Sequence, residues 1–300
     1  MGRRRVEVTR ITALERTGWM PEPSRPRTDE ASAVDVIERG DVLFYPRLAF
    51  PVLEDEAPLF SPAILSTAKN ASFDPVSDRV SGTTLPTAAA QRLRGLMRRF
   101  SDAAARLLDD ILPTYRGRLQ RARASFRPAE IAGRVSSWRK DDSRLHVDSF
   151  PASPVQGRRI LRVFANVNPH GKPRAWRVGD DFEALADRFA SRLSMPWPGQ
   201  GTVLELLRVT KTRRTPYDAL MLQLHDRMKE DDAFQRGTAQ TAMDFPAGTT
   251  WVAFTDQVSH AAMSGQYQLE QTFLLPVDAM MDENRSPLRV LERRFGRRLA

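Results

Sequence analysis

The sequence predicts a mainly β protein with flanking helices, built on a double-stranded β-helix, the jelly roll of cupin-like proteins. One alternating run and two further apolar runs indicate the strands of its core. These runs cover residues 158–168, 248–254 and 267–275. A His-x-Asp triplet precedes the first run, and His260 lies between the other two. Metal ligands at opposite ends of a β-rich core are the layout expected of this fold.

Short strands and loops are expected in the part of the chain that precedes the longest helix. Residues 6–11 predict one short strand, and the Pro- and charge-rich stretch 21–30 predicts an exposed loop. Apolar residues at 41–46 and 48–50 indicate two strands interrupted by prolines. Residues 62–85 are rich in Ser, Thr, Asn, Asp and Gly, which predicts a long surface loop.

Helices are predicted from apolar residues at helical spacing, most clearly over residues 85–112, where arginines occupy the opposite face. Residues 116–123 predict a shorter helical piece, whereas 133–140 predict the strand that enters the triplet. Further helices are expected at 180–193, 217–230 and 286–295. An arginine cluster after the longest helix is interpreted as a solvated face and comprises Arg118, Arg121, Arg123 and Arg127.

Residues 1–300 are expected to form a single domain, because the helical segments have no separate core of their own. Helical insertions around 85–125 and 180–230, and a basic C-terminal helix at 286–296, are predicted to pack on the strands. The chain contains no cysteine, which excludes disulfides and thiolate metal ligands. It shows neither a secretory signal nor an apolar run long enough to span a bilayer, so a cytoplasmic protein is expected.

The net charge indicates an anionic partner. The 46 basic and 37 acidic residues give a formal net charge of +9. Phosphate, carboxylate, nucleic acid or an acidic membrane face would all suit this charge. A generally arginine-rich composition explains the excess equally well.

His146, Asp148 and His260 are the predicted metal ligands. In extended backbone, residues two apart point the same way, so His146 and Asp148 are able to grip one ion, with His260 as the third ligand. Two imidazoles and one carboxylate with the remaining positions open suit a non-haem iron(II) oxygenase. A His-x-Asp triplet also arises by chance in about one such chain in three. His225 and His170 are interpreted as surface histidines.

An oxygenase of this kind leaves room at iron(II) for a 2-oxo acid and O2, and the far carboxylate of the 2-oxo acid needs a cation. Many such enzymes place a basic residue on the strand after the distal histidine, but residues 266–272 contain neither Arg nor Lys. Arg162 is the predicted substitute, with Asn166 and Gln268 adding hydrogen bonds. The alternative is that Arg162 faces outward from its strand.

Three segments together resemble the Kdo hydroxylase family, where Kdo is 3-deoxy-D-manno-oct-2-ulosonic acid. The segments are 137–148, 161–169 and 254–261. The resemblance implies a dioxygenase that uses Fe2+, 2-oxoglutarate and O2, with ascorbate as reductant in vitro, to hydroxylate C3 of Kdo in the lipopolysaccharide inner core. It also implies that His146, Asp148 and His260 bind the iron.

The resemblance implies an acidic sugar on a lipid A precursor as the partner, and no nucleic acid. The arginines of helix 286–296 then predict peripheral contact with the anionic cytoplasmic face of the inner membrane, although a helix that merely caps the barrel is the alternative. Two other functions stay open: a related 2-oxoglutarate oxygenase acting on protein or nucleic acid, and a non-enzymatic sugar-binding jelly roll. The sequence leaves the oligomeric state open.

Overall fold

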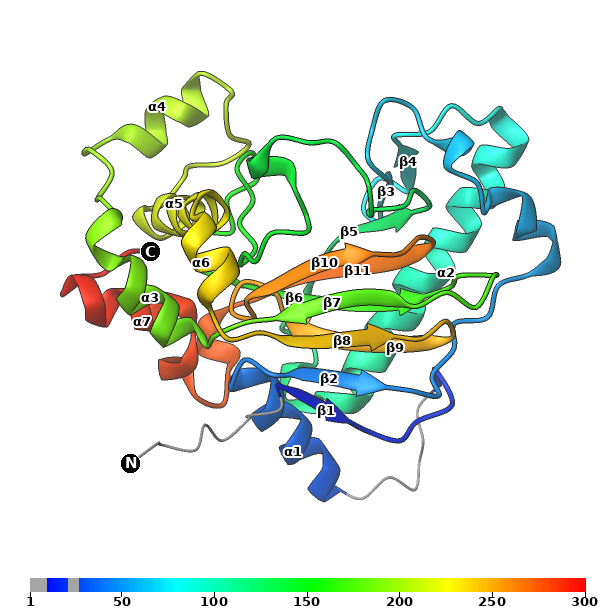
Figure 1. The fold of residues 1–300 in the computed structure, drawn as a ribbon, viewed down its shortest axis with the longest axis horizontal. Coiled ribbons are helices and arrows are strands. Elements are labelled where there is room, and N and C mark those ends of the chain that lie inside the picture. Colours follow the sequence, from blue (N-terminus) through cyan, green and yellow to red (C-terminus); the bar gives the residue numbers. More distant parts are fainter. Residues whose placement is uncertain (1–9, 21–26) are drawn as a thin grey trace.

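A computed structural model describes residues 10–20 and 27–300, and two β-sheets form its centre (Figure 1). The larger sheet contains, in spatial order, β1 (Ile11–Ala13), β2 (Val42–Tyr45), β9 (Thr249–Phe254), β6 (Arg159–Asn166), β11 (Gln268–Leu275), β5 (Gln120–Arg127), β3 (Ala71–Asp74) and β4 (Arg79–Ser81). The smaller sheet contains β10 (His260–Ser264), β7 (Arg174–Val178) and β8 (Thr241–Phe245). Neighbouring strands are antiparallel except β1 and β2, which run parallel. This arrangement is the predicted jelly roll.

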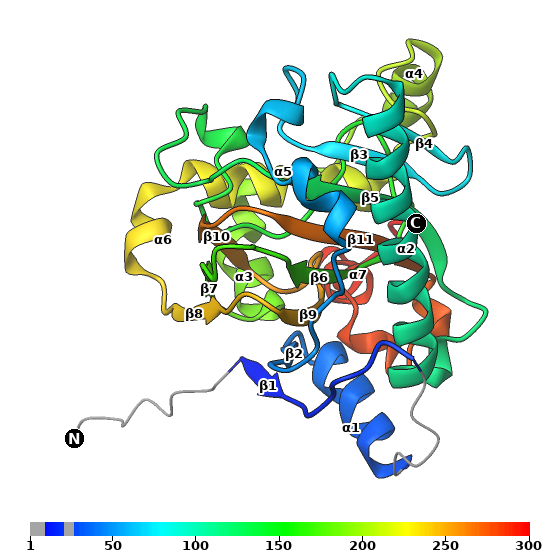
Figure 2. The ribbon, with the colours of Figure 1, turned by 90° about the vertical axis from the view of Figure 1, so that its right-hand side faces the viewer.

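Helices cover the outer face and the ends of the sheets (Figure 2). They are α1 (Arg27–Glu38), α2 (Thr87–Ile111), α3 (Phe182–Phe189), α4 (Gln200–Leu206), α5 (Pro216–Glu230), α6 (Asp232–Gly237) and α7 (Pro287–Phe295). The long helix α2 contacts β5 and β11, which places its apolar stripe on the larger sheet. Within the described residues, none of the helices is long and apolar enough to cross a membrane.

Strand β6 separates two hydrophobic clusters, because successive side chains of a strand point to opposite faces. Leu161, Val163 and Ala165 belong to the main core, which α2 also enters. Phe164 belongs to a second cluster, where it lies 5.1 Å from Trp176 of the smaller sheet, measured between ring centroids. Arg162 and Phe164 alternate with these three residues along β6. Their side chains therefore point into the space between the two sheets, as the alternation predicts.

The predictions for the N-terminal part need correction at several places. Residues 6–9 and 21–26, on which two of the predictions fall, lie outside the described residues, and the predicted loop at 27–30 is the start of α1. The predicted strand at 48–50 is irregular chain. The predicted loop 62–85 contains the β3–β4 hairpin. Prolines and polar residues obscured these elements, because hairpin pairing outweighs weak local propensity.

Two predictions around the arginine cluster are wrong. The predicted helical piece 116–123 is wrong, because residues 120–127 form strand β5, whose buried residues Ala124 and Phe126 alternate with Arg123, Ser125 and Arg127 on the other face. The predicted strand 133–140 is irregular chain that ends in the 3-10 turn Trp138–Lys140. Strands β7, β8 and β10 were not predicted, because each is only five residues long.

The C-terminal helix α7 forms where it was predicted and packs as a cap. Leu288, Val290 and Leu291 are buried against the core. Its arginines Arg293 and Arg294 form ion pairs with Glu183 and Asp187 of α3. These contacts favour the alternative reading of a capping helix over the reading of a membrane-contacting helix.

Candidate active site

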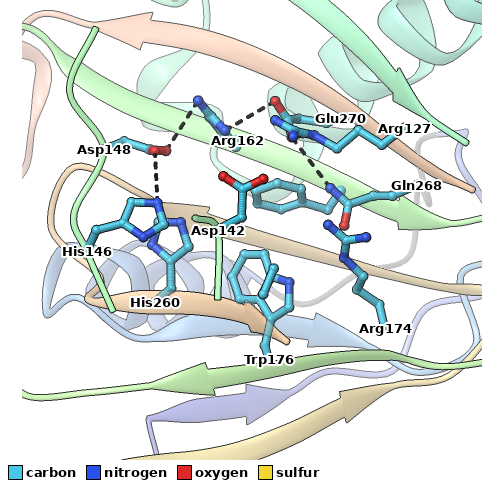
Figure 3. Close-up of a pocket in the computed structure, with 12 residues that line it drawn as sticks. Arg127, Asp142, His146, Asp148, Arg162, Arg174, Trp176, His260, Gln268 and Glu270 are labelled. Atoms are coloured by element: carbon cyan, nitrogen blue, oxygen red, sulfur yellow. Dashed lines mark hydrogen bonds and ion pairs between the residues drawn. The ribbon is translucent and has the colours of Figure 1, made fainter. Parts of the chain in front are cut away.

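His146 and His260 are joined by a two-residue antiparallel bridge. The backbone N–H of each donates to the carbonyl of the other, at 3.0 Å from His146 and 2.9 Å from His260. The next inward-pointing residue, Asp148, donates its backbone N–H to the carbonyl of Thr255 at 2.7 Å. Because residues two apart in extended chain point the same way, Asp148 lies beside the two imidazoles (Figure 3). The structure thus brings the three predicted ligands together.

Backbone carbonyls fix the tautomer of both histidines. His146 Nδ1 lies 2.7 Å from the carbonyl of Arg144, and His260 Nδ1 lies 2.8 Å from the carbonyl of Val258. A neutral imidazole that donates from Nδ1 keeps the lone pair on Nε2 for a metal. His146 Nε2 faces Asp148 Oδ1 at 3.9 Å, and one ligand atom from each of the three residues lies within 4.8 Å of the others.

The charge states of these groups suit a divalent cation. Burial lowers the pKa of His146 well below its ordinary value, and burial lowers that of His260 in the same direction. Burial raises the pKa of Asp148, but Arg162 and the two histidines outweigh this effect and hold the pKa below its ordinary value. Two neutral imidazoles and one carboxylate therefore face each other at neutral pH.

The residues present fit an iron(II) ion. Asp148 Oδ2 is buried and accepts no hydrogen bond, although Arg162 Nη2 lies 3.3 Å away. A buried carboxylate oxygen without a donor is costly unless a cation completes its surroundings. Nitrogen and oxygen donors without sulfur suit non-haem iron(II).

Three arginines converge on the pocket beside these ligands, and a single glutamate neutralises two of them. Glu270 lies 3.0 Å from Arg127 Nε and 3.1 Å from Arg162 Nη1. Burial raises the pKa of Glu270, but Arg127 and Arg162 outweigh this and keep the pKa below its ordinary value. Arg127 and Arg162 are therefore already paired with buried carboxylates.

Arg174, the third arginine, forms no ion pair with a carboxylate among the described residues. Its Nη1 donates to the carbonyl of Gly265 at 2.8 Å, while its Nε is buried and makes no hydrogen bond. Burial and the neighbouring Arg127 lower the pKa of Arg174 to about 9. Gly265 has a φ of +115°, and a Cβ there would lie 2.8 Å from Arg174 Cδ. The glycine thus lets β10 approach this arginine closely.

Two further buried polar atoms line the same pocket without a partner. Trp176 Nε1 is a donor and Gln268 Oε1 an acceptor, and both are buried beside Arg174 (Figure 3). Unsatisfied buried polar atoms in a cavity indicate a ligand that completes their hydrogen bonds. Arg174 and Trp176 lie on the unpredicted strand β7, and Arg127 lies on β5, whose first half was predicted as helical.

The predicted 2-oxoglutarate residues are only partly brought together. Arg162 and Gln268 line the pocket. Asn166 lies on the same strand face as Arg162, but its amide donates to the carbonyls of Lys172 and Phe245 at 3.0 and 2.9 Å. It is absent from the pocket lining, although Gln268, its register partner on β11, is part of that lining.

His225 lies closer to the site than predicted. Its ring centroid is 5.3 Å from that of His146, and its side chain is only 16% exposed, so the surface reading of this residue is wrong. Its Nδ1 lies 3.0 Å from Asp226 Oδ1. His170 is exposed, as predicted.

Comparisons with known proteins identify the family. A profile of 3-deoxy-D-manno-oct-2-ulosonic acid (Kdo) hydroxylases matches residues 21–298. The chain belongs to the Kdo hydroxylase family. It is a non-haem iron(II)- and 2-oxoglutarate-dependent dioxygenase, and the substrate of its family is Kdo. A search among curated proteins found no match.

Solved structures of the Kdo hydroxylase KdoO have the same fold. The complex with cobalt(II) superposes with a TM-score of 0.94 at 44% identity, covering 96% of this chain and 97% of that chain. The complex with α-ketoglutarate and Fe(III) gives 0.93 at 43% identity, covering 97% of each chain. The predicted fold, family and cofactors are therefore confirmed, and the alternative of a non-enzymatic sugar-binding protein is wrong.

Proposed function

We propose that His146, Asp148 and His260 hold iron(II), and that the enzyme hydroxylates C3 of Kdo while this sugar is attached to a lipid A precursor. The observation that carries the proposal is the convergence of two imidazoles and one carboxylate from distant segments, with one ligand atom of each within 4.8 Å of the others. Backbone hydrogen bonds to both Nδ1 atoms support it, since they aim the remaining lone pairs at one point. We further propose that residues 1–300 act as one dioxygenase domain.

Iron(II) with 2-oxoglutarate and O2 supplies the oxidising power for hydroxylation of an unactivated carbon. The protein's own residues hold, orient and shield these reactants. Arg162 keeps Asp148 ionised and fixed, because its guanidinium bridges Asp148 and Glu270. The ring of Trp176 stacks on that of His260, with 5.0 Å between ring centroids, and lines the pocket on the side of the smaller sheet.

We propose Arg174 as the principal anchor of the 2-oxoglutarate carboxylate, with Trp176 and Gln268 completing the hydrogen bonds. Arg174 is supported by its burial and its lack of a carboxylate partner among the described residues, because a buried unpaired guanidinium favours an anionic ligand. Arg162 is the second candidate, but its guanidinium already forms ion pairs with Asp148 and Glu270.

We propose that the sugar reaches the site from the side of Asp142. This residue lines the candidate active site and also a second cavity of about 280 Å³ formed by residues 131–143 and Met263. Lys69 and Arg134 lie 3.6 and 3.8 Å from its carboxylate. Cations at the junction of two cavities suit a sugar that carries its own carboxylate. On this proposal the enzyme works peripherally at the cytoplasmic face of the inner membrane.

Mass spectrometry tests the proposed function directly. The protein is incubated with a Kdo-linked lipid A precursor, iron(II), ascorbate and 2-oxoglutarate, and the glycolipid is fragmented. We expect a gain of one oxygen atom located on a Kdo unit, together with one succinate for each oxygen inserted. A product unchanged in mass, or oxygen located on the lipid, would contradict the proposal.

A further inference from the structure

A projecting segment of 17 residues, 197–213, carries apolar side chains that face away from the protein. It contains helix α4, and Figure 1 shows α4 standing clear of the two sheets. We call this segment the α4 arm. Four of its large apolar residues are strongly exposed: Trp197 at 54%, Leu206 at 77%, Leu207 at 69% and Val209 at 53%. Clustered exposure of this kind marks a surface that contacts another body.

The α4 arm is held in a defined shape at its base. Gly201, near the start of the arm, lies very close to Arg214, which directly follows the arm. A Cβ at Gly201 would lie 2.0 Å from the carbonyl oxygen of Arg214. Thr210 is buried, and the N–H of Lys211 donates to the carbonyl of Ala152 at 2.9 Å. At the tip Arg208 adopts a left-handed backbone with φ of 56°, which turns the chain back. The exposed side chains are therefore presented by a closed loop instead of a loose tail.

Cations flank the apolar residues of the arm. Arg208, Lys211 and Arg213 are all exposed, and none forms an ion pair with a carboxylate of the described residues. Glu205 is the arm's one acidic residue. A tryptophan, leucines and unpaired cations on one short element are the composition of a segment that inserts at an anionic lipid interface.

Another exposed apolar tip lies on the same side of the sheets. The turn between β3 and β4 carries Val76, which is 90% exposed. Lys211 of the arm lies near enough to Asp74 of this hairpin to contribute to lowering its pKa. Figures 1 and 2 both show α4 and the β3–β4 hairpin on the same side of the sheets. Two exposed apolar elements on one side of the sheets suit a flat partner.

We infer that the α4 arm docks the enzyme on an anionic phospholipid surface through Leu206 and Leu207, with Arg208 and Lys211 contacting lipid phosphates. This inference rests on the proposed function, because a sugar attached to lipid A must be taken from a membrane. Basic residues near such a surface are attracted to anionic headgroups, and the inserted leucines add the apolar contribution. It also relocates the membrane contact predicted for α7, whose Arg293 and Arg294 are engaged with α3.

Sedimentation with vesicles tests this docking surface without using the enzymatic reaction. The full chain is mixed with vesicles of phosphatidylethanolamine and phosphatidylglycerol, and the bound fraction is compared for wild type and the double variant Leu206→Asp/Leu207→Asp. We expect the double variant to bind at least about ten-fold more weakly. The control is Met281→Asp, which places an aspartate at a 70%-exposed methionine that lies by α1. The control should bind like wild type.

Charge and self-association provide two further tests. Arg208→Glu/Lys211→Glu should weaken binding to the same vesicles and remove most of its dependence on salt, because these cations are expected to provide the electrostatic part. Binding that is unchanged in both double variants overturns the docking surface, as does wild type that fails to bind.

Analytical ultracentrifugation tests whether the patch binds a second copy of the chain instead. A wild-type dimer that Leu206→Asp/Leu207→Asp converts to monomer, without vesicle binding, would assign the patch to that second copy.

The reaction separates failure of docking from failure of the proposed function. Leu206→Asp/Leu207→Asp should oxidise a deacylated, water-soluble Kdo glycoside at the wild-type rate, and lose rate only on the vesicle-embedded precursor. Equal loss on both substrates contradicts a docking role. Wild type that oxidises neither substrate refutes the proposed function, while the sedimentation result still decides whether the arm binds lipid.

Discussion

The backbones of His146 and His260 exchange two hydrogen bonds, of 3.0 and 2.9 Å, although 114 positions separate these residues in the chain. The spacing between the imidazoles is therefore set by main-chain pairing and does not depend on either side chain. Asp148 is fixed in the same way by its backbone bond to Thr255. Main-chain hydrogen bonds thus hold the three residues side by side, which reduces the reorganisation required for binding an ion.

Replacing one imidazole should remove metal binding while leaving the fold intact. In His146→Ala or His260→Ala the backbone bridge remains, but only two of the three proposed ligands do. Cobalt(II) should raise the melting temperature of wild type through preferential binding to the folded state, and should leave either variant unchanged. The measurement is thermal unfolding with and without cobalt(II), together with metal analysis of the purified protein. A variant that retains one metal per chain and full turnover would refute the ligand assignment.

Arg174→Gln should raise the KM for 2-oxoglutarate by about ten-fold or more, because a charge-assisted pair to a carboxylate is replaced by neutral hydrogen bonds. Cobalt(II) affinity should stay near the wild-type value, since Arg174 is absent from the ligand cluster. Initial rates at varied 2-oxoglutarate provide the measurement. The matched variant Arg177→Gln changes the other arginine of β7, which contacts Met263 and Ser143 and does not line the pocket of Arg174, and it should leave this KM unchanged.

Arg162→Ala should affect metal and 2-oxoglutarate together. The substitution leaves Asp148 and Glu270 buried with one cation fewer, so the pKa of Asp148 rises and the carboxylate becomes a poorer ligand at neutral pH. We expect weaker cobalt(II) binding in calorimetry as well as a higher requirement for 2-oxoglutarate. A variant with unchanged cobalt(II) affinity and a higher KM would instead identify Arg162 as a direct carboxylate anchor.

The buried pair of Arg159 and Asp256 should dominate the stability of the loop that leads to His260. Arg159 Nε lies 2.8 Å from Asp256 Oδ2, and both side chains are almost fully buried. Asp256→Ala leaves the guanidinium uncompensated and should lower the free energy of unfolding by about 3–5 kcal/mol in urea titrations. The control Glu15→Ala breaks the exposed pair with Arg47, whose side chains are 68% and 65% exposed, and should cost at most about 1 kcal/mol.

Cobalt(II) binding to the metal-free enzyme should depend weakly on pH between 7.5 and 6. Burial holds the pKa of His146 and of His260 below the ordinary value of 6.5, so both rings take up fewer protons over this interval than free histidine does. Two ordinary histidines would lose about ten-fold in affinity over this interval. Titration by the visible absorbance of cobalt(II) measures the effect, and a loss of that size would contradict the prediction.

Burial of the two histidines also makes the stability of the metal-free enzyme depend on pH. As the pH falls below 6.5, His146 and His260 bind protons in the unfolded chain but bind them more weakly in the folded chain, because their pKa values are lowered there. The metal-free enzyme should therefore become less stable as the pH falls towards the lowered pKa values, and this contribution should be constant above about 7. Urea unfolding of wild type and His146→Ala across this range checks the sign, because the variant should lose part of the slope.

The convergence of the three proposed ligands could be predicted from sequence, because it needs only residue type and the alternation of a strand. His146 and Asp148 share a side wherever the chain is extended, and His260 is the remaining histidine beside a strong strand. The direction of Arg162 followed from the same rule on β6. Pairing between distant strands was required only to bring these groups together.

The remaining arginines of the site could not be predicted by that rule. Arg127 and Arg174 lie on β5 and β7, and each reaches the pocket through the order of strands in the sheets. Arginine-rich β5 also mimics a polar helix, because the buried side of its sequence shows only alanine and phenylalanine. The face of Asn166 on β6 was also predicted. The sequence did not show that the carbonyls of Lys172 and Phe245 would bind its amide, because both come from other segments of the fold.

The stacking of Trp176 on His260, at 5.0 Å and 20° between the ring planes, gives this enzyme an internal optical probe. A paramagnetic ion held by that histidine would sit within quenching range of the indole, so the protein's own emission should dim as the centre fills. Occupancy could then be followed in real time, without a label and without consuming oxygen.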